Sequence, residues 1–313
     1  HEAQVVGEGR RFTYLFQYQD ITPQFRTETG FVRRTDIRHV NNYYHFYFRP
    51  EGKHLVFHGP ELSFDRTWDH EGTGVEYNGN VDWVFSYRNN SFFAPIVGIE
   101  SDTLRPQDFS GLTFNHKFTQ DFVGLVFGAA PTHFISFNVN VFRQGTVDVV
   151  VPAGQLPIEG DDTSINTNVT LHPMSPLTVD NTYILDRVVH NDLHASVYNN
   201  HIIRTKWNYQ FTREFSLRFI AQYNGLLANS TFTSLKTTKN LNFDVLFTYL
   251  VHPGTAVYVG YNSNLENIDP GLCIHIAGTT QCDPNGNGLL RNNERLINDG
   301  RVIFVKLSYL FRH

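Results

Sequence analysis

Residues 239–264 alternate between apolar and polar side chains with a period of two, and this pattern constrains the fold more than any other feature of the sequence. The odd positions from 241 to 251 are all aliphatic or aromatic, whereas the even positions include asparagine, aspartate and threonine. Successive side chains of a β-strand point to opposite faces, so the pattern predicts a strand with a different environment on each side. His252, Pro253 and Gly254 predict a tight turn, and positions 255–264 alternate again. The stretch therefore predicts a β-hairpin.

The same alternation recurs along the chain and predicts about fourteen strands of roughly 8 to 13 residues, the length that crosses a bilayer at a tilt. The pair Gly59-Pro60 interrupts one of these strands and predicts a bulge or bend there. Short turns are expected near residues 50, 89, 131, 173, 213 and 253, and mostly longer loops at 20–38, 102–115, 145–162, 189–200, 226–238 and 263–300. Short turns on one rim and long loops on the other are typical of an outer-membrane barrel, with the turns in the periplasm.

We therefore expect an all-β fold, an antiparallel transmembrane β-barrel over residues 1–313 in a bacterial outer membrane, with residues 263–300 forming a long extracellular loop. Mean hydropathy is -0.31 and no apolar run reaches about 18 residues, which excludes membrane-spanning helices. A secreted β-sandwich or carbohydrate-binding module would also alternate, but its strands are usually shorter and its rims are not asymmetric. The net charge of -5 is spread without a basic stripe, so we expect no nucleic-acid partner.

The polar face of the expected strands carries charges that would be costly in the core of a soluble sandwich but are stable in a water-filled lumen. The residues predicted to face the lumen are Arg204, Lys206, Arg218, Asp244 and Lys306. Large aromatic residues are enriched at both membrane interfaces. The aromatics predicted there are Trp83, Trp207, Tyr209, Tyr249 and Tyr309.

Four segments in order along the chain resemble one protein family: FRTETGFVRRTD at 25–36, FSLRFIAQYN at 215–224, YLVHPGTAVYVGYN at 249–262 and FVKLSYLFR at 304–312. The family comprises bacterial outer-membrane proteins of unknown function whose full chains carry an N-terminal carbohydrate-binding, family-nine-like domain before a large C-terminal barrel. The resemblance extends from about Gly9 over nearly the whole chain. It implies that this sequence is the C-terminal part of a longer chain and that its strands are an arc of a wider barrel. The family supplies no catalytic residues to carry over.

Residues 283–294 match the pattern D-x-N-x-N-G-x5-E of a calcium-binding loop. Oxygen atoms would come from the side chains of Asp283, Asn285, Asn287 and Glu294 and from the carbonyl of Leu289. With two carboxylates among these ligands, a dissociation constant of roughly 0.1 to 1 mM is expected, as in extracellular modules. The alternative is an Asn/Gly-rich cluster of turns that binds no ion. Calcium is the one cofactor that the sequence predicts.

Cys273 and Cys282 lie just before this pattern in the same expected loop, and they are the chain's two cysteines. An outer-surface location favours a disulfide between them, which would stabilise the loop by roughly 2 to 3 kcal/mol in the chain-entropy model. Two reduced thiols are the alternative. A bridge and a metal ion together would order a loop that otherwise costs much conformational entropy.

These patterns lead to competing hypotheses about function. The first is a porin-like barrel that passes small solutes, or a membrane anchor for soluble domains and partners. The second is a plugged scaffold whose calcium-braced outer loops bind proteins or glycans. A third is an outer-membrane hydrolase that uses the carboxylates expected in the 145–162 loop, Glu159, Asp161 and Asp162. No nucleophile elbow, phosphate loop or CxxC motif is present, so we expect no enzymatic activity; the expected partners are outer-membrane lipid and proteins or glycans at the outer loops.

Overall fold

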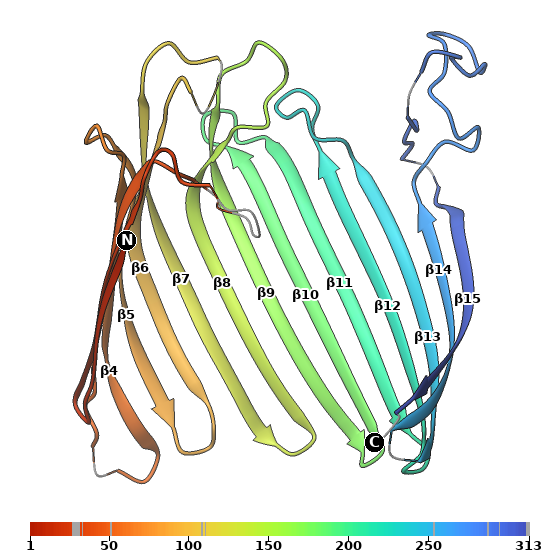
Figure 1. Ribbon diagram of the computed structural model, residues 1–313, viewed down its shortest axis with the longest axis horizontal. Coiled ribbons are helices and arrows are strands. Elements are labelled where there is room, and N and C mark those ends of the chain that lie inside the picture. Colours follow the sequence, from red (N-terminus) through yellow and green to blue (C-terminus); the bar gives the residue numbers. More distant parts are fainter. Residues whose placement is uncertain are drawn as a thin grey trace. The chain divides into compact units, whose positions relative to one another are not determined.

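The computed structural model describes residues 1–26, 32, 34–50, 52–107, 109, 111–252, 254–286, 288–293 and 295–310. Within them, fifteen strands form one antiparallel sheet in which each strand pairs with the next along the chain (Figure 1). The predicted all-β class is confirmed. The strands are β1 (Glu2–Glu8), β2 (Phe12–Ile21), β3 (Ile37–Phe46), β4 (Leu55–Trp68), β5 (Gly74–Tyr87), β6 (Phe92–Leu104), β7 (His116–Thr132), β8 (Ile135–Asp148), β9 (Ile158–Met174), β10 (Leu177–His190), β11 (Ser196–Gln210), β12 (Phe215–Ala228), β13 (Thr238–His252), β14 (Thr255–Glu266) and β15 (Ile297–Tyr309).

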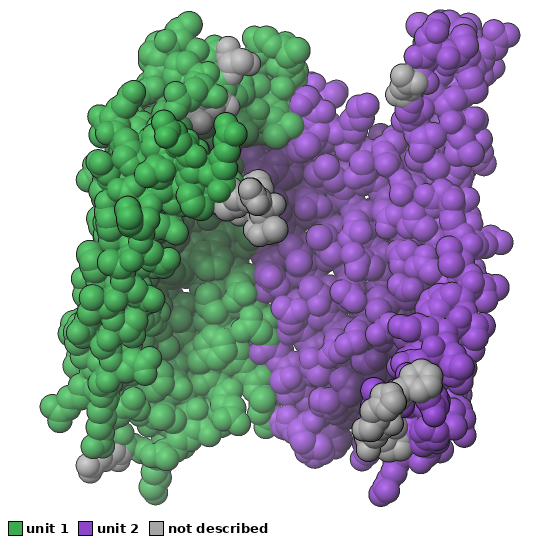
Figure 2. All heavy atoms as spheres, viewed as in Figure 1, with its two compact units in different colours: residues 1–131, 138–164, 189–194 green, residues 132–137, 165–188, 195–313 purple. Residues whose placement is uncertain are grey.

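The chain divides into two compact units, which are treated separately below (Figure 2). Unit 1 comprises His1–Pro131, Asn138–Ser164 and Val189–His194, and unit 2 comprises Thr132–Phe137, Ile165–Val188 and Ala195–His313. Unit 1 thus contains β1 to β7 almost entirely, and unit 2 contains β11 to β15. Among the described residues, no helix is long and apolar enough to cross a membrane.

The strand prediction was incomplete in number and in length. The count of about fourteen missed β1, whose sequence EAQVVGE has no aromatic alternation, and the strands extend to 17 residues in β7 and β9. The observed strands are longer than predicted mainly at their loop-side ends. Polar residues occupy both faces there, so the alternation of apolar and polar residues ends while the backbone hydrogen bonds between strands continue. For this reason Glu159, Asp161 and Asp162 belong to β9 and not to a loop. The last long loop is correspondingly shorter than predicted, 267–296 instead of 263–300.

The bulge or bend expected at Gly59-Pro60 is absent on the side of β5, but the ladder to β3 is interrupted there: it stops at His45 opposite Glu61, and an isolated bridge between Phe48 and His58 follows. The ladder between β4 and β5 is continuous there, with Gly59 opposite Val84 and Pro60 opposite Trp83. Its irregularities lie instead near the two ends of β4, at Leu55/Phe57 and at Thr67/Trp68. Glycine is required at position 59 because a Cβ atom would meet the backbone carbonyl of Phe46.

The connections alternate between the two ends of the strands (Figure 1). On the turn side they are 9–11, 47–54, 88–91, 133–134, 175–176, 211–214 and 253–254; on the loop side they are 22–36, 69–73, 105–115, 149–157, 191–195, 229–237 and 267–296. The predicted asymmetry is therefore present, although 69–73 and 191–195 are short for loops. Pro253, predicted to shape a turn, lies outside the described residues.

Directly paired residues of an antiparallel ladder share a face, so the register separates two faces in unit 2. One continuous row across β11 to β15 is apolar: Trp207, Phe219, Val245, Tyr261 and Ile303. The next row along the strands lies on the opposite face and is more polar: Lys206, Ile220, Asp244, Asn262 and Val302. The alternation read from residues 239–264 therefore extends across the whole of this unit.

Unit 1 has the same two faces. Its apolar face contains the row Tyr14, Tyr44, Leu62, Val81, Val97 and Val123 across β2 to β7. Its polar face contains the row Gln17, Asn41, Asp65, Asn78, Glu100 and Gln120. The side chains of the apolar face are open to the surroundings, with Val97 56% and Val123 55% exposed. An apolar surface this extended requires a partner, and lipid is the one that suits a sheet of this kind.

Among the aromatic rings that interrupt the polar faces, two lie over the glycine opposite them in the ladder. Phe122 of β7 covers Gly98 of β6, its partner in the ladder, and Phe304 of β15 covers Gly260 of β14 in the same way. A ring that lies flat on glycine takes the space that a side chain would otherwise fill. These two exceptions to the alternation are thus packed within the sheet and do not extend far from it.

Candidate functional site

The polar face of unit 2 carries every charged residue that the sequence predicted to face a lumen. The register places them at even positions of β11, β12, β13 and β15, which share this face: Arg204, Lys206, Arg218, Asp244 and Lys306. Lys206 Nζ donates to Asp180 Oδ2 on β10 at 3.2 Å, and Lys306 Nζ lies 5.9 Å from the centre of the Tyr258 ring. The face thus combines cations with a background of asparagine and glutamine. That it faces a lumen remains a prediction.

The polar face of unit 1 is acidic, which the sequence analysis missed. The register brings six carboxylates of β4, β5 and β6 onto it: Glu61, Asp65, Glu76, Asp82, Glu100 and Asp102. Glu61 and Asp82 are directly opposite each other, an arrangement of like charges that is unfavourable without a counter-charge. Arg34 of the 22–36 loop supplies one counter-charge, with its Nη1 atom 3.6 Å from Glu76 Oε1. The sequence could have placed each carboxylate on the polar face, because each alternates with residues of the apolar face. That the six lie near one another follows only from the pairing register between the strands.

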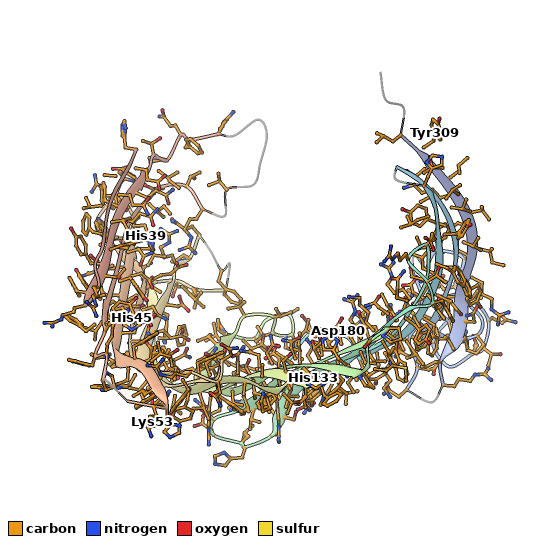
Figure 3. All side chains as sticks on the ribbon, turned by 90° about the horizontal axis from the view of Figure 1, so that it is seen from below. His39, His45, Lys53, His133, Asp180 and Tyr309 are labelled. Carbon is orange, nitrogen blue, oxygen red and sulfur yellow. A yellow bond between two sulfur atoms is a disulfide. The ribbon has the colours of Figure 1, made fainter. Side chains whose placement is uncertain are left out.

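His45 extends this acidic row toward β3. Its Nδ1 lies 3.3 Å from Glu61 Oε2, and its ring stacks on Tyr47 with centroids 3.9 Å apart. Only 5% of His45 is exposed, and its Nε2 makes no hydrogen bond within the described part of the chain. His39 and His45, both labelled in Figure 3, are six positions apart on one strand and so share a face. The row can exchange protons and attract cations, but it holds no nucleophile that would define a reaction.

A hollow of about 500 Å³ lies at the loop end of unit 1. Apolar residues including Leu112, Phe118 and Leu156 form much of its wall. His116 and Glu159 contribute the polar groups from strands, and Asp192 contributes one from the 191–195 connection. Of the carboxylates considered for a hydrolase, only Glu159 borders this hollow, while Asp161 accepts a hydrogen bond from Arg143 at 2.9 Å. Glu159 and Asp161 border a second hollow of about 210 Å³ together with Asp121, whereas Asp162 lies on the other face of β9. The structure therefore gathers two of the three predicted carboxylates.

Two loops of unit 1 are joined by a buried ion pair. Arg105 Nη1 lies 3.1 Å from Asp69 Oδ2, with side chains 9% and 6% exposed. The other oxygen, Asp69 Oδ1, accepts the backbone N–H of Thr73 at 2.8 Å and so closes the 69–73 connection. Burial raises the pKa of Asp69, but the hydrogen bonds from Thr73 and Arg105 outweigh it and hold that pKa below its usual value. Neither residue was singled out from the sequence, since their separation of 36 positions gives no local signal.

The 267–296 loop of unit 2 contains the predicted disulfide between Cys273 and Cys282. Its base is fixed by Asn267, which is 1% exposed; its side-chain oxygen accepts from the backbone N–H of Lys239, and its side-chain nitrogen donates to the backbone carbonyl of Asn292. Arg291 adds an ion pair to Glu266 at 2.9 Å. The loop is therefore attached to the ends of β13 and β14 at its base and closed by a covalent link nearer its tip.

The calcium prediction is only partly covered by the structure. Asp283 Oδ1 accepts the N–H of Asn285 at 2.9 Å, and Gly288 has a φ of 131°, as a sharp turn requires. Leu289 is exposed, whereas Asn287 and Glu294 lie outside the described residues. No three histidine, cysteine or carboxylate side chains of the described residues converge as metal ligands. The calcium site therefore stays a prediction.

The aromatic residues predicted for the membrane interfaces all lie at odd positions on the apolar face, toward the turn side: Trp83, Trp207, Tyr209, Tyr249 and Tyr309. On the loop side the same face becomes polar, because Val123 gives way to Asp121 and Thr119 along β7. A bilayer needs only about 9 to 11 residues of each strand. The strands of 14 to 17 residues therefore have an apolar part that fits a membrane and a polar part that extends beyond it on the loop side.

An apolar outer surface of bilayer height, a charged opposite face, and turns and loops at separate ends define the class of protein. It is an outer-membrane protein whose antiparallel sheet is of the β-barrel type. Its location in a bacterial outer membrane follows from that class.

Comparisons with known proteins give distant similarities to structures of this kind. The FrpB iron transporter from Neisseria meningitidis is similar over 85% of this chain and 53% of its own, at 11% identity and a TM-score of 0.48. The siderophore receptor PirA from Acinetobacter baumannii is similar over 99% and 55%, at 8% identity and a TM-score of 0.46. OmpT, an outer membrane protein of Vibrio cholerae, is similar over 98% and 99%, at 10% identity and a TM-score of 0.34.

The chain spans about half the length of the iron-transporter and siderophore-receptor chains that it matches. No protein-family model matches the sequence, and no curated protein does so either. The assignment to the class rests on the two faces of the sheet and on the length of its strands.

The ion pair between Asp69 and Arg105 predicts a pH-dependent opening of the loops that it joins. A carboxyl whose pKa is lowered by folding stabilises the folded state above its unfolded pKa of about 3.9, and this contribution is lost as the pH falls through the lower, folded-state pKa. Asp69→Asn should remove this contribution at neutral pH, because the amide carries no charge to pair with the buried Arg105 guanidinium, at a cost of about 3 kcal/mol. We expect hydrogen exchange in 69–73 and 105–115 to accelerate by roughly 100-fold.

Arg143→Gln is the matched control, because it breaks an ion pair of similar length, 2.9 Å, whose side chains are 69% and 46% exposed. Its effect should stay below about 1 kcal/mol. Equal acceleration by the two substitutions, or no difference in the loops between neutral and acidic pH after correction for intrinsic exchange, would contradict the assignment.

Proposed function

We propose that this sheet forms part of the wall of an aqueous pore that passes small polar solutes across the outer membrane. The observation that carries the proposal is the continuous polar face of each unit, on which charged residues occupy successive strands. Charges on a sheet whose other face is apolar need water or counter-ions on their own side. A water-filled lumen supplies both.

The charges of the two polar faces differ in sign. Carboxylates prevail in unit 1, whereas Arg204, Lys206, Arg218 and Lys306 prevail in unit 2. Fields from charges that line a confined aqueous passage raise the local concentration of ions of opposite sign. A solute with separated positive and negative groups, or small ions of either sign, would be stabilised along such a wall. The substrate that these faces favour is thus polar and charged, not apolar.

Planar-bilayer recordings of the longer chain, in which these strands would be part of a closed barrel, test the pore directly, and discrete conductance steps are expected. Replacing Glu61, Asp82 and Glu100 by glutamine should lower the ratio of cation to anion permeability by roughly two- to fivefold, the effect of a charge interaction below about 1 kcal/mol in water. Replacing Arg204, Arg218 and Lys306 by glutamine should raise it by a similar factor. The reversal potential in a salt gradient measures both changes.

Lys117→Gln is the control, because Lys117 is paired with Thr103 on the opposite face of β7 and should leave selectivity unchanged. A chain that inserts without conducting, or conductance whose selectivity ignores the polar-face substitutions, would rule out the pore.

A membrane-inserted chain without conductance would favour the second candidate, a plugged scaffold or anchor. The observation in its favour is the order of the 267–296 loop, which the Cys273–Cys282 disulfide and the buried Asn267 brace. A calcium ion bound by Asp283, Asn285, Asn287, Leu289 and Glu294 would brace it further. Such a loop could present a fixed surface to a protein or a glycan. A hydrolase has less support, since Asp161 is paired with Arg143 and Asp162 lies on the other face of β9 from Glu159 and Asp161.

We also propose that the fifteen strands are an arc of a larger barrel in a longer chain, as in the family with a family-nine-like N-terminal domain. Successive strands run in opposite directions, so β1 and β15 run in the same direction. An antiparallel barrel cannot close between two parallel strands, and at least one more strand is required. Bacterial single-chain barrels have even strand numbers. On β15, Val305 is 72% exposed, whereas its partner on β14, Val259, is 41% exposed. This difference fits a further neighbour beside β15, and an unpaired ladder in lipid would be costly.

Heat-modifiable gel migration tests the arc. We expect residues 1–313 alone to migrate as an unfolded chain whether or not the sample is boiled, because both edges of their sheet would be open. The longer chain should run as a compact species before boiling and as an extended one afterwards. A compact unboiled band from residues 1–313 alone would show that these strands close a barrel by themselves.

A further inference from the structure

A hollow of about 700 Å³ lies at the turn end of unit 1, where the 9–11 and 47–54 turns meet. Its wall combines guanidinium groups with aromatic rings, and the main contributors are Arg10, Arg11, Arg49, Phe46, Phe48 and His58. Phe46, Phe48 and His58 lie on the apolar face, whereas the Arg49 guanidinium lies over Tyr47, whose ring stacks on His45 of the polar face. The hollow thus borders both faces at the turn end and requires an explanation of its own.

Backbone contacts between the two turns set the positions of the arginines. The N–H of Tyr47 donates to the carbonyl of Arg11 at 2.9 Å, and Arg49 Nε donates to the carbonyl of Arg10 at 3.1 Å. The Arg49 guanidinium also lies 5.1 Å from the centre of the Tyr47 ring and 5.5 Å from that of Phe57. Such stacking holds the planar group in place while part of its hydrogen-bonding capacity stays free.

The hollow concentrates positive charge. Arg10, Arg11 and Arg49 are all exposed. Within the parts of the chain that the structure describes, no carboxylate lies within ion-pair distance of any of them. Arginine side chains around one hollow repel one another, so the described groups of this wall favour an anionic occupant.

The other wall of the hollow continues into the apolar face of the sheet. Phe46 and Phe48 are 39% and 50% exposed, and Phe46 packs on Phe12 with ring centroids 4.5 Å apart. Phe48 stacks at 6.3 Å on Trp83, whose Nε1 donates to His58 Nδ1 at 3.3 Å. Aromatic residues with a polar tip lie at the headgroup level of a bilayer. The hollow is thus open to lipid chains on one side and to water on the other.

We propose that this hollow binds the phosphate headgroup of an anionic phospholipid in the membrane leaflet on the turn side. Guanidinium forks match phosphate oxygens in two-point hydrogen bonds, and basic pockets at the membrane surface attract anionic lipids. The exposed phenylalanines provide an apolar surface for the acyl chains, which a free phosphate ion could not use. The acyl chains of such a lipid would contact Phe46, Phe48 and Trp83, which belong to the apolar face and not to the proposed pore wall.

Trp83 provides a local reporter for the test, since it contacts both Phe48 and His58 of the hollow. Residues 1–313 contain two other tryptophans, Trp68 and Trp207. For this experiment both would be substituted by phenylalanine, so that the fluorescence comes from Trp83. The protein is placed in phosphatidylcholine bilayers that contain a minor fraction of brominated phosphatidylglycerol or, in parallel, of brominated phosphatidylcholine. Bromine quenches Trp83 only when the labelled lipid is adjacent. We expect roughly fivefold stronger association of the anionic lipid, weakened at high salt.

The combined substitution of Arg10, Arg11 and Arg49 by glutamine should abolish this preference, whereas Arg213→Gln should retain it. Arg213 is an exposed arginine in a turn of unit 2 and is the matched control. Arg11→Gln alone is expected to lower the preference about twofold, and it keeps the side-chain hydrogen bond that joins the turns, which belongs to Arg49. Arg11→Gln therefore tests the site even if the triple variant does not fold.

Equal quenching by the two lipids in the parent protein would overturn the proposal. So would a preference that survives loss of the arginines in the folded variants, because it would then arise elsewhere on the sheet. Inorganic phosphate added to the same bilayers should not displace the brominated phosphatidylglycerol. Complete displacement by phosphate would assign the hollow to a soluble anion instead of a lipid.

Discussion

Backbone hydrogen bonding in lipid is the constraint on which the rest of the structure depends. The hydrocarbon of a bilayer offers no partner for an N–H or C=O group, so a strand can cross it only when both of its neighbours satisfy the ladder. Strands β2 to β14 meet this requirement by pairing with the strands before and after them in the sequence, and β1 and β15 are the edges at which the proposed larger barrel would continue. Once the ladder is fixed, the period of two assigns every side chain to one of two faces. The chemistry of the protein then reduces to what each face and each end carries.

The faces and ends carry different chemistry. The apolar face is built from aliphatic and aromatic rows such as Trp207, Phe219 and Val245, and its aromatic content increases toward the turns. The polar face is acidic in unit 1 and mainly basic in unit 2. The loop end has the features of an aqueous surface: the Asp69–Arg105 ion pair, a hollow with polar groups and a disulfide-bonded loop. The turn end carries the arginine and aromatic groups that we assign to lipid.

The sequence predicted those features that repeat at short range. Period-two alternation identified most strands, the faces of Arg218 and Asp244, and the apolar side of Trp83 and Tyr249. It failed where alternation is weak, as in β1, and at the loop ends of strands such as β9, where both faces are polar. It also could not gather residues that only the register brings together, such as Glu61 and Asp82, or Asp69 and Arg105. The disulfide could be predicted from the sequence because its two cysteines are only nine positions apart.

The central claim is that one face of this sheet contacts lipid and the other contacts water, and a spin-label accessibility scan along β13 tests it most directly. Labels would be attached one at a time to cysteines at positions 240–251 of the membrane-inserted protein; both native cysteines are engaged in the disulfide. Collisions with oxygen report lipid, and collisions with a water-soluble nickel chelate report the aqueous phase. We predict oxygen accessibility at odd positions and nickel accessibility at even positions. A profile without alternation, or odd positions shielded from both reagents as in the core of a soluble sandwich, would contradict the account.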